Sequence, residues 1–172
     1  RVLWERSYEP DRAHRIELEL RVVLFEGNGR KVLVDTGTGN LWSDKEQGLY
    51  DVDAPGVPGV VGALKAAGIE AESITDVILT HLHFDHAGGV TRRAADGTPV
   101  PTFPSARHHL QRTNLDTARE PNERERKSYL RRHWEPLLDL DLVLHEGAAE
   151  VLPGLFVDPT AGHTEGLQVV RA

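Results

Sequence analysis

Apolar and polar residues alternate most regularly near the start of the chain. The alternating apolar positions are Ile16, Leu18, Leu20, Val22 and Leu24. Glu17, Glu19 and Arg21 stand between them, and this period of two predicts a half-buried strand. An Asn-Gly pair follows at residues 28–29, and this pair tolerates the positive φ angles of a tight hairpin. We therefore expect the chain to return as a second strand over residues 31–34.

A continuous apolar run, Val77-Ile78-Leu79, has a different character. Such a run is typical of a short strand that is buried on both faces. A helix that packs on the core is expected before it, because apolar residues recur at helical spacing and Gly68 can end the helix. These residues are Val57, Val60, Val61 and Leu64. The preceding stretch, residues 41–57, is polar and contains Gly and Pro, so we predict a long loop that is either mobile or part of a binding rim.

The second half of the chain alternates short apolar runs with turns. We predict strands at residues 100–103, 106–110, 142–145, 151–152, 155–157 and 167–170. A strongly charged region, residues 111–138, interrupts this series and surrounds Tyr129 and Trp134 with Glu, Arg and Lys. It is either a helix with a solvated, ion-paired face or a helical lid whose arginines meet an acidic substrate. In both cases Tyr129 or Trp134 can point into the pocket.

Composition limits the class of protein. A chain of 172 residues is long enough for one domain with a sizeable core. The apolar and charged fractions, 39% and 27%, are those of a soluble globular protein, and no apolar run approaches membrane-spanning length. The net charge of −7 argues against a nucleic acid as the main partner. Cysteine is absent, which excludes disulfides and thiolate chemistry.

The chemistry of the chain concentrates in one stretch, residues 80–89, with the sequence THLHFDHAGG. Four side chains that can bind a metal fall within six residues: His81, His83, Asp85 and His86. Residues two apart in an extended segment point the same way, so the first two histidines can converge on one ion. Imidazole and carboxylate together suit zinc, iron or manganese better than calcium or magnesium. Unrelated surface histidines are the alternative, but a fourfold cluster directly after a buried strand favours a metal site.

The other histidines lack partners at such spacing. We expect His108 and His109 to be exposed strand residues, and we assign no role to His14, His133 or His145.

The motif His81-x-His83-x-Asp85-His86 resembles the signature of the metallo-β-lactamase superfamily, and the match extends from the Val-Asp-Thr-Gly segment at residues 34–37 to Gly162-His163-Thr164. The resemblance implies an α/β fold, an αβ/βα four-layer sandwich of two mixed β-sheets flanked by helices. Residues 1–172 would form a single domain of this kind, incomplete at its C-terminus. Leu82 and Phe84 make the motif most similar to that of acyl-homoserine-lactone lactonases.

The resemblance also implies a set of metal ligands. His163 would join His81 and His83 around a first ion, while Asp85 and His86 would bind a second. The superfamily has two further ligands downstream, an Asp and a His, and neither lies within these 172 residues. The expected cofactor is one or two zinc ions, with iron or manganese as alternatives. Asp35 is either a turn residue or, as the resemblance favours, a carboxylate that orients a ligand histidine without binding metal.

The expected activity is that of a metal-dependent hydrolase. Three histidines with an open fourth position are typical of a catalytic zinc ion, which provides hydroxide at neutral pH to attack a lactone, an ester or a similar electrophile. Asp85 is the candidate catalytic residue, because it can hold or relay a proton. A true β-lactamase and a thioesterase of the glyoxalase II type are other members of the superfamily to which the motif applies.

Two other functions stay open at this stage. One is an RNA-processing nuclease of the same superfamily, in which arginines between Arg124 and Arg132 would bind phosphates. The other is a non-catalytic metal-binding domain. For the main interpretation we expect a small-molecule substrate, no nucleic acid and no membrane partner, a cytoplasmic location, and a homodimer as one form of assembly.

Overall fold

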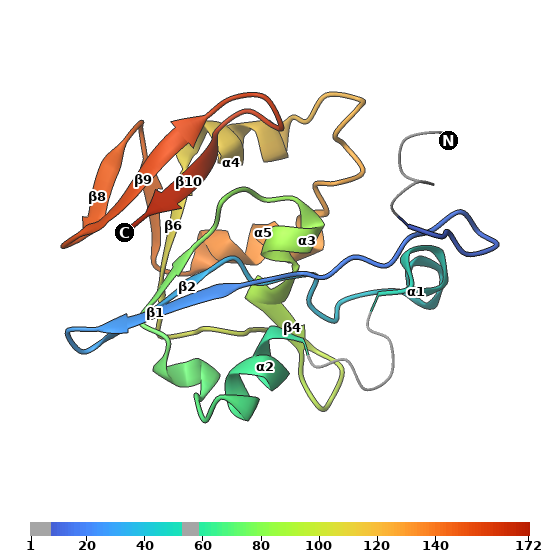
Figure 1. Cartoon of the computed structure of the whole chain (residues 1–172), viewed down its shortest axis with the longest axis horizontal. Coiled ribbons are helices and arrows are strands. Elements are labelled where there is room, and N and C mark those ends of the chain that lie inside the picture. Colours follow the sequence, from blue (N-terminus) through green and yellow to red (C-terminus); the bar gives the residue numbers. More distant parts are fainter. Residues whose placement is uncertain (1–7, 53–58) are drawn as a thin grey trace.

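The larger of two main β-sheets organises the molecule. In the computed structural model, which describes residues 8–52 and 59–172, this sheet has the strand order β1-β2-β3-β6-β7 (Figure 1). β1 and β2 form an antiparallel hairpin, whereas β2, β3, β6 and β7 run parallel. The five strands are β1 (Val23–Gly27), β2 (Arg30–Val34), β3 (Asp76–Ile78), β6 (Arg107–Gln111) and β7 (Leu142–His145).

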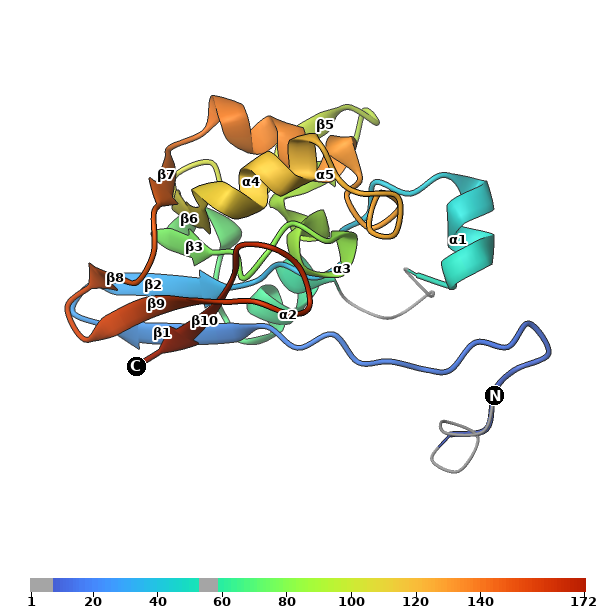
Figure 2. The same ribbon diagram turned by 90° about the horizontal axis from the view of Figure 1, so that it is seen from above.

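The smaller main sheet contains the last three strands in the antiparallel order β10-β9-β8. They are β8 (Ala149–Leu152), β9 (Leu155–Thr160) and β10 (Leu167–Arg171). A separate two-stranded ladder joins β4 (Thr91–Arg93) to β5 (Pro99–Pro101). β9 and β10 lie beside the β1–β2 hairpin in both views (Figures 1 and 2).

The helices are short. The α-helices are α1 (Asp44–Tyr50), α2 (Val60–Ala66), α3 (Phe84–Ala87), α4 (Arg112–Arg119) and α5 (Arg131–Trp134). The described residues also contain three 3-10 turns: η1 (Ala71–Ser73), η2 (Gly88–Val90) and η3 (Glu135–Asp139).

The two faces of the larger sheet pack against different partners. Leu33, Val77 and Leu110 contact a core that includes helical residues such as Leu64 and Leu115. The residues next to them along the strands point to the opposite face, where they pack against the smaller sheet. This second hydrophobic core contains Val32, Val34, Ile78, Leu155 and Val157. The alternation follows from the period of two along a strand. A helical layer, the larger sheet and the smaller sheet are therefore stacked, and the predicted α/β class with two sheets is confirmed.

Most of the predicted strands are present. The Asn28-Gly29 hairpin turn is confirmed, since both residues have positive φ (50° and 73°), and the return strand matches β2. The apolar run at residues 77–79 is buried on both faces as expected. The predicted strands of the second half correspond to β5 to β10, with their ends shifted by no more than a few residues.

The prediction of a strand from Ile16 is wrong. Leu18 and Leu20 are exposed (72% and 46%), and β1 begins only at Val23, opposite Val34. The reason is that β2, the partner of β1, ends at Val34, and an alternating pattern without a neighbouring strand forms no ladder. The segment before β1 instead contacts α1, since the Arg15 side chain donates to the carbonyl of Gly48 (3.1 Å) (Figure 1).

Residues 41–52, the described part of the predicted loop at residues 41–57, contain a helix that was not predicted. Helix α1 occupies residues 44–50 and begins with a capping box between Ser43 and Glu46, a signal that defines a helix start. Trp42, which precedes the capping box, is buried. The predicted helix that follows is α2, which buries Leu64 but leaves Val61 exposed, and Val57 lies outside the described residues.

His108 and His109 were predicted to be exposed, and this prediction is wrong. Both are buried, because β6 lies between β3 and β7 in the larger sheet. His109 contacts Asp76 (3.3 Å) and His145 (3.1 Å). His133, in α5, is buried as well.

Candidate metal centre

The candidate metal centre lies at the carboxyl ends of β2 and β3. These strands are parallel neighbours, so the residues that follow them, Asp35 after β2 and Thr80-His81 after β3, meet at one edge of the sheet. Parallel sheets commonly place ligand sites at this edge. Asp35 has a positive φ of 60° and its N–H donates to the carbonyl of Ile78 (2.9 Å), which joins the two strand ends.

Glycines allow the metal-binding stretch to pack tightly onto the loop after β2. A Cβ atom added to Gly88 would lie 2.2 Å from the carbonyl oxygen of Thr38, and one added to Gly89 would lie 2.1 Å from that of Thr36. Because no side chain fits such gaps, only glycine permits this approach. The loop also fixes the stretch directly, since Thr36 N–H donates to the carbonyl of His86 (2.7 Å).

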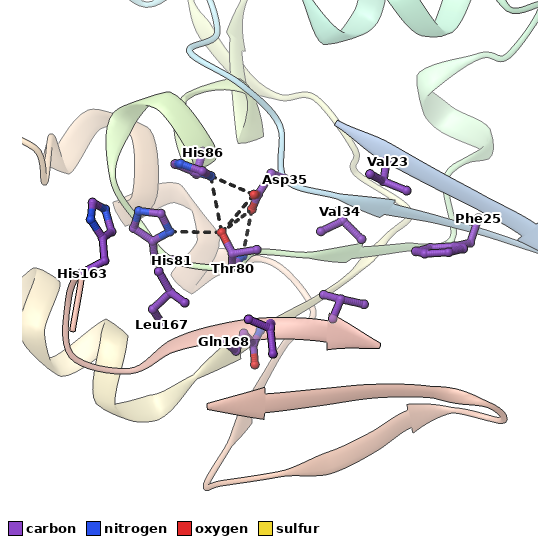
Figure 3. Close-up of a pocket in the computed structure, with 12 residues that line it drawn as sticks. Val23, Phe25, Val34, Asp35, Thr80, His81, His86, His163, Leu167 and Gln168 are labelled. Carbon is purple, nitrogen blue, oxygen red and sulfur yellow. Dashed lines mark hydrogen bonds and ion pairs between the residues drawn. The ribbon is translucent and has the colours of Figure 1, made fainter. Parts of the chain in front are cut away.

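Three histidines from two distant segments converge here. His81 and His83 come from the stretch after β3, and His163 comes from the loop between β9 and β10 (Figure 3). One ring nitrogen of each lies within 4.8 Å of the others. His163 Nε2 is 3.2 Å from His83 Nδ1, and the ring of His81 lies at centroid distances of 4.5 Å from His83 and 4.9 Å from His163.

The protonation state of the His81 and His83 rings suits metal binding. Burial, reinforced by the neighbouring histidines, lowers the pKa of His81 to about 2 and also lowers the pKa of His83. Both rings are therefore neutral near pH 7 and keep the lone pair that a ligand needs. The Nε2 atom of His81 is buried without a hydrogen-bond partner, an arrangement that costs free energy unless an ion occupies the site. The donor set thus fits a divalent transition metal.

Asp35 and Thr80 hold the rings in place. Asp35 Oδ2 is 2.8 Å from His86 Nδ1, and its Oδ1 accepts a hydrogen bond from Thr80 N–H (2.8 Å). The Thr80 hydroxyl contacts both carboxylate oxygens and lies 3.0 Å from His81 Nδ1 (Figure 3). Asp35 therefore contacts a candidate ligand histidine directly, as predicted for a carboxylate that orients one.

Asp85 and His86 lie next to the three histidines. His86 Nε2 is 3.5 Å from Asp85 Oδ2, and the rings of His86 and His81 have a centroid distance of 4.1 Å. Burial acts to lower the pKa of His86, but the hydrogen bond and charge of Asp35 outweigh it and raise this pKa. A second ion at Asp85 and His86 stays a prediction, because these two residues fall outside the group of three convergent ligands within the described residues.

Asn114, in α4, is a site residue that the sequence did not indicate. It is fully buried, and its Oδ1 accepts from the N–H of Leu82, between His81 and His83. Its Nδ2 donates to the carbonyl of Glu165 (2.7 Å), two residues after His163. Asn114 thereby ties together the two segments that carry the three histidines. No periodicity or motif marks an asparagine of this kind, because its partners are distant in sequence.

A groove of about 440 Å³ opens beside the histidines (Figure 3). Its apolar walls come from the larger sheet and from β10, with Val23, Phe25, Val34, Leu167, Val169 and Val170 as lining residues. Its polar end is formed by Asp35, Thr80, His81, His86 and His163. A molecule with an apolar portion and a polar, reactive group fits this division.

Comparison with known proteins agrees with the geometry. A family model described as "Metallo-beta-lactamase superfamily" matches residues 21–171. The chain is 32% identical over 162 residues to an N-acyl homoserine lactonase from a Bacillus species, and it is 31% identical over 162 residues to the lactonase AiiA of Bacillus thuringiensis subsp. kurstaki. Each match covers 89% of this chain and 58% of the relative, so the chain spans little more than half the length of these curated relatives.

Solved structures show the same similarity. A probable metal-dependent hydrolase from Staphylococcus aureus superimposes with a TM-score of 0.82 at 25% identity, over 98% of this chain and 58% of that one. An N-acyl homoserine lactone hydrolase with the product N-hexanoyl-L-homoserine bound at its catalytic metal center gives a TM-score of 0.63 at 30% identity. That match covers 87% of this chain and 56% of the other.

Proposed function

Because this chain belongs to the metallo-beta-lactamase superfamily, we propose that it acts as a metal-dependent hydrolase that opens a lactone ring or cleaves a related ester. The observation that carries this proposal is the convergence of His81, His83 and His163, because two of them, His81 and His163, also line the polar end of an apolar groove. The similarity to N-acyl homoserine lactonases at about a third identity supports a lactone as the substrate class.

Zinc is the cofactor we propose, with iron or manganese as alternatives. Three convergent histidines, with no fourth ligand joining them among the residues that the structure describes, are typical of a catalytic zinc ion. When bound, such an ion supplies a water molecule of lowered pKa and a positive charge beside a developing oxyanion. His81, His83 and His163 would hold the first ion, and Asp85 and His86 would hold a second.

The residues of this chain would divide the remaining tasks. Asp85, whose side chain is 40% exposed, would hold or pass on the proton released during hydrolysis. Asp35 and Thr80 would orient His86 and His81. The apolar walls of the groove would bind the hydrocarbon part of the substrate and exclude water from it.

A nuclease is disfavoured by the contacts of the charged region. Arg132 donates to the carbonyl of Leu41 and to Glu46 (2.8 Å each), and Arg131 pairs with Glu135 (3.2 Å). Arg131 and Arg132 are thus engaged within the protein, and the net charge of −7 also counts against a nucleic acid as the partner. A small molecule is the partner we propose.

No helix in the described parts of the chain is long and apolar enough to cross a membrane.

Hydrolysis assays on one panel of substrates test the proposal. Purified protein loaded with zinc is offered an N-acyl homoserine lactone, a thioester, a β-lactam and a single-stranded RNA, before and after removal of the metal by a chelator. We expect the lactone to be hydrolysed fastest, with activity lost on chelation and restored by zinc. Faster cleavage of RNA, or lactone hydrolysis that survives complete removal of metal, would contradict the proposal.

A further inference from the structure

The orientation of the His83 ring leaves one of its nitrogens unexplained. Its Nδ1 faces His163 Nε2 at 3.2 Å, so Nδ1 is the atom directed toward the other two histidines. Its Nε2 is on the far side of the ring and is buried without a hydrogen-bond partner. An imidazole that offers one nitrogen to an ion carries a hydrogen on the other, and this N–H needs an acceptor.

The carboxylate of Glu125 faces this nitrogen. Glu125 Oε2 lies 4.0 Å from His83 Nε2, and both side chains are largely buried (20% and 8% exposed). Hydrogen bonds from Thr164 and Asn122 lower the pKa of Glu125. The side chain is thus an anion near pH 7, and an anion is the acceptor that a ligand histidine most often uses.

A chain of hydrogen bonds fixes Glu125 in this position. Asn114 Nδ2 donates to the Tyr129 hydroxyl (3.2 Å), which lies 2.6 Å from Thr164 Oγ1. The Thr164 hydroxyl then donates to Glu125 Oε2 (2.6 Å). This series of hydrogen bonds ends at the Glu125 carboxylate, which only accepts hydrogen bonds. The carboxylate can therefore also accept a hydrogen bond from His83 Nε2–H.

The backbone around Glu125 is also held against the site. The ring of Tyr129 packs edge-on against His83 at a centroid distance of 4.6 Å. The carbonyl of Ser128 accepts from the N–H of Phe84 (2.9 Å), the residue that follows His83. Glu125 therefore belongs to a segment in contact with the metal-binding stretch, and its proximity to His83 is built into the fold.

We propose that Glu125 is a positioning residue for the metal centre: in the metal-bound protein its carboxylate closes the 4.0 Å separation, accepts the Nε2–H of His83 and so keeps Nδ1 directed at the ion. The proposal rests on the metal-binding role of His83 in the proposed function. It assigns to the 122–129 segment a structural part in ligand orientation. In this respect Glu125 would act on His83 as Asp35 acts on His86.

Metal affinity of Glu125→Gln tests this role. The amide keeps the size of the side chain but removes its charge, so we expect zinc affinity, measured by competition with a chromogenic chelator, to fall about ten- to a hundredfold. Glu123→Gln is the matched control, because Glu123 is exposed on the same turn and its replacement changes the net charge equally. That control should bind zinc as the unmodified protein does.

Nuclear magnetic resonance gives a second, independent measurement. In the zinc-loaded protein the His83 Nε2–H proton should be protected and shifted downfield, and in Glu125→Gln this signal should move upfield or exchange with water. Unchanged zinc affinity together with an unchanged His83 signal in Glu125→Gln would overturn the positioning role of Glu125 but leave the proposed metal site intact. If His83→Ala binds zinc as tightly as the unmodified protein, the metal site proposed for His83 fails instead, and the inference fails with it.

Discussion

Asp35 Oδ2 and His86 Nδ1 lie 2.8 Å apart although fifty-one positions separate them in the chain. The contact is set by the parallel pairing of β2 with β3, which brings the two strand ends together. It shows how one acidic residue at the end of a strand can orient the side chains of a metal-binding stretch that follows the neighbouring strand.

Replacement of Asp35 by asparagine should weaken zinc binding near His86. Asparagine tolerates the positive φ of 60° as aspartate does, so the backbone should be retained while the negative charge is lost. We expect the weaker-bound zinc equivalent, proposed for Asp85 and His86, to lose about ten- to a hundredfold in affinity. Titration calorimetry with zinc measures this change.

Asp51→Asn is the control for that substitution. Asp51 also has a positive φ (55°), but its side chain is 72% exposed and its ion partner is Arg15. Zinc binding should be unaltered in this variant. Equal binding curves for Asp35→Asn and Asp51→Asn would show that Asp35 does not orient a ligand.

Two glycine-to-alanine substitutions should change stability in opposite directions. Alanine at Gly88 would place a Cβ atom 2.2 Å from the carbonyl oxygen of Thr38, and we expect a loss of about 3 kcal/mol or more in the free energy of unfolding. Alanine at Gly48, within α1, meets no atom within 4 Å and should gain about 0.5–1 kcal/mol. Urea denaturation of the metal-free proteins compares the two. A stable Gly88→Ala variant would contradict the close packing of the two loops.

Buried histidines should make the metal-free protein sensitive to acid. Both ring nitrogens of His108 are buried without partners, and burial lowers its pKa to about 4. The unfolded chain, with an ordinary histidine pKa of about 6.5, takes up a proton that the folded protein does not. Stability is therefore complete above pH 6.5 and falls as the pH drops toward 4, with about 2 kcal/mol lost by pH 5 from this residue.

His108→Phe should remove that part of the pH dependence while filling a similar volume. Urea denaturation at pH 7.5 and pH 5 measures the difference in unfolding free energy for both proteins. His133, whose pKa burial also lowers to about 4, would still contribute in the variant. An identical loss of stability in the variant and the unmodified protein would rule out His108 as a source of acid sensitivity.

The sequence was most informative where the partners of a residue are its near neighbours. The apolar run at residues 77–79, the hairpin at Asn28-Gly29 and the spacing of His81 and His83 each express local rules of strands and turns. The structure confirms the first two and brings His163 to the pair, the partner that only the family resemblance had indicated.

Residues whose environment depends on distant partners were missed or misplaced. Asn114 accepts from the N–H of Leu82, beside His83, and Glu125 faces His83 Nε2, and no period or motif encodes either contact. His109 was expected at the surface because its partners, Asp76 and His145, become neighbours only when β3, β6 and β7 align. The strand predicted before Val23 from alternating apolar residues was wrong for the same reason, since a strand requires a neighbouring strand as well as an alternating pattern.

The proposed function depends most directly on the convergence of His81, His83 and His163, and zinc binding at equilibrium tests whether they hold a metal ion. Metal-free protein should take up at least one zinc ion per chain, and a variant carrying both His81→Ala and His83→Ala should lose the tightest site. His14→Asn, a change at an exposed histidine with a positive φ, should bind zinc as the unmodified protein does. Failure of the unmodified protein to bind zinc, iron or manganese, or equally tight binding by the double variant, would contradict the account.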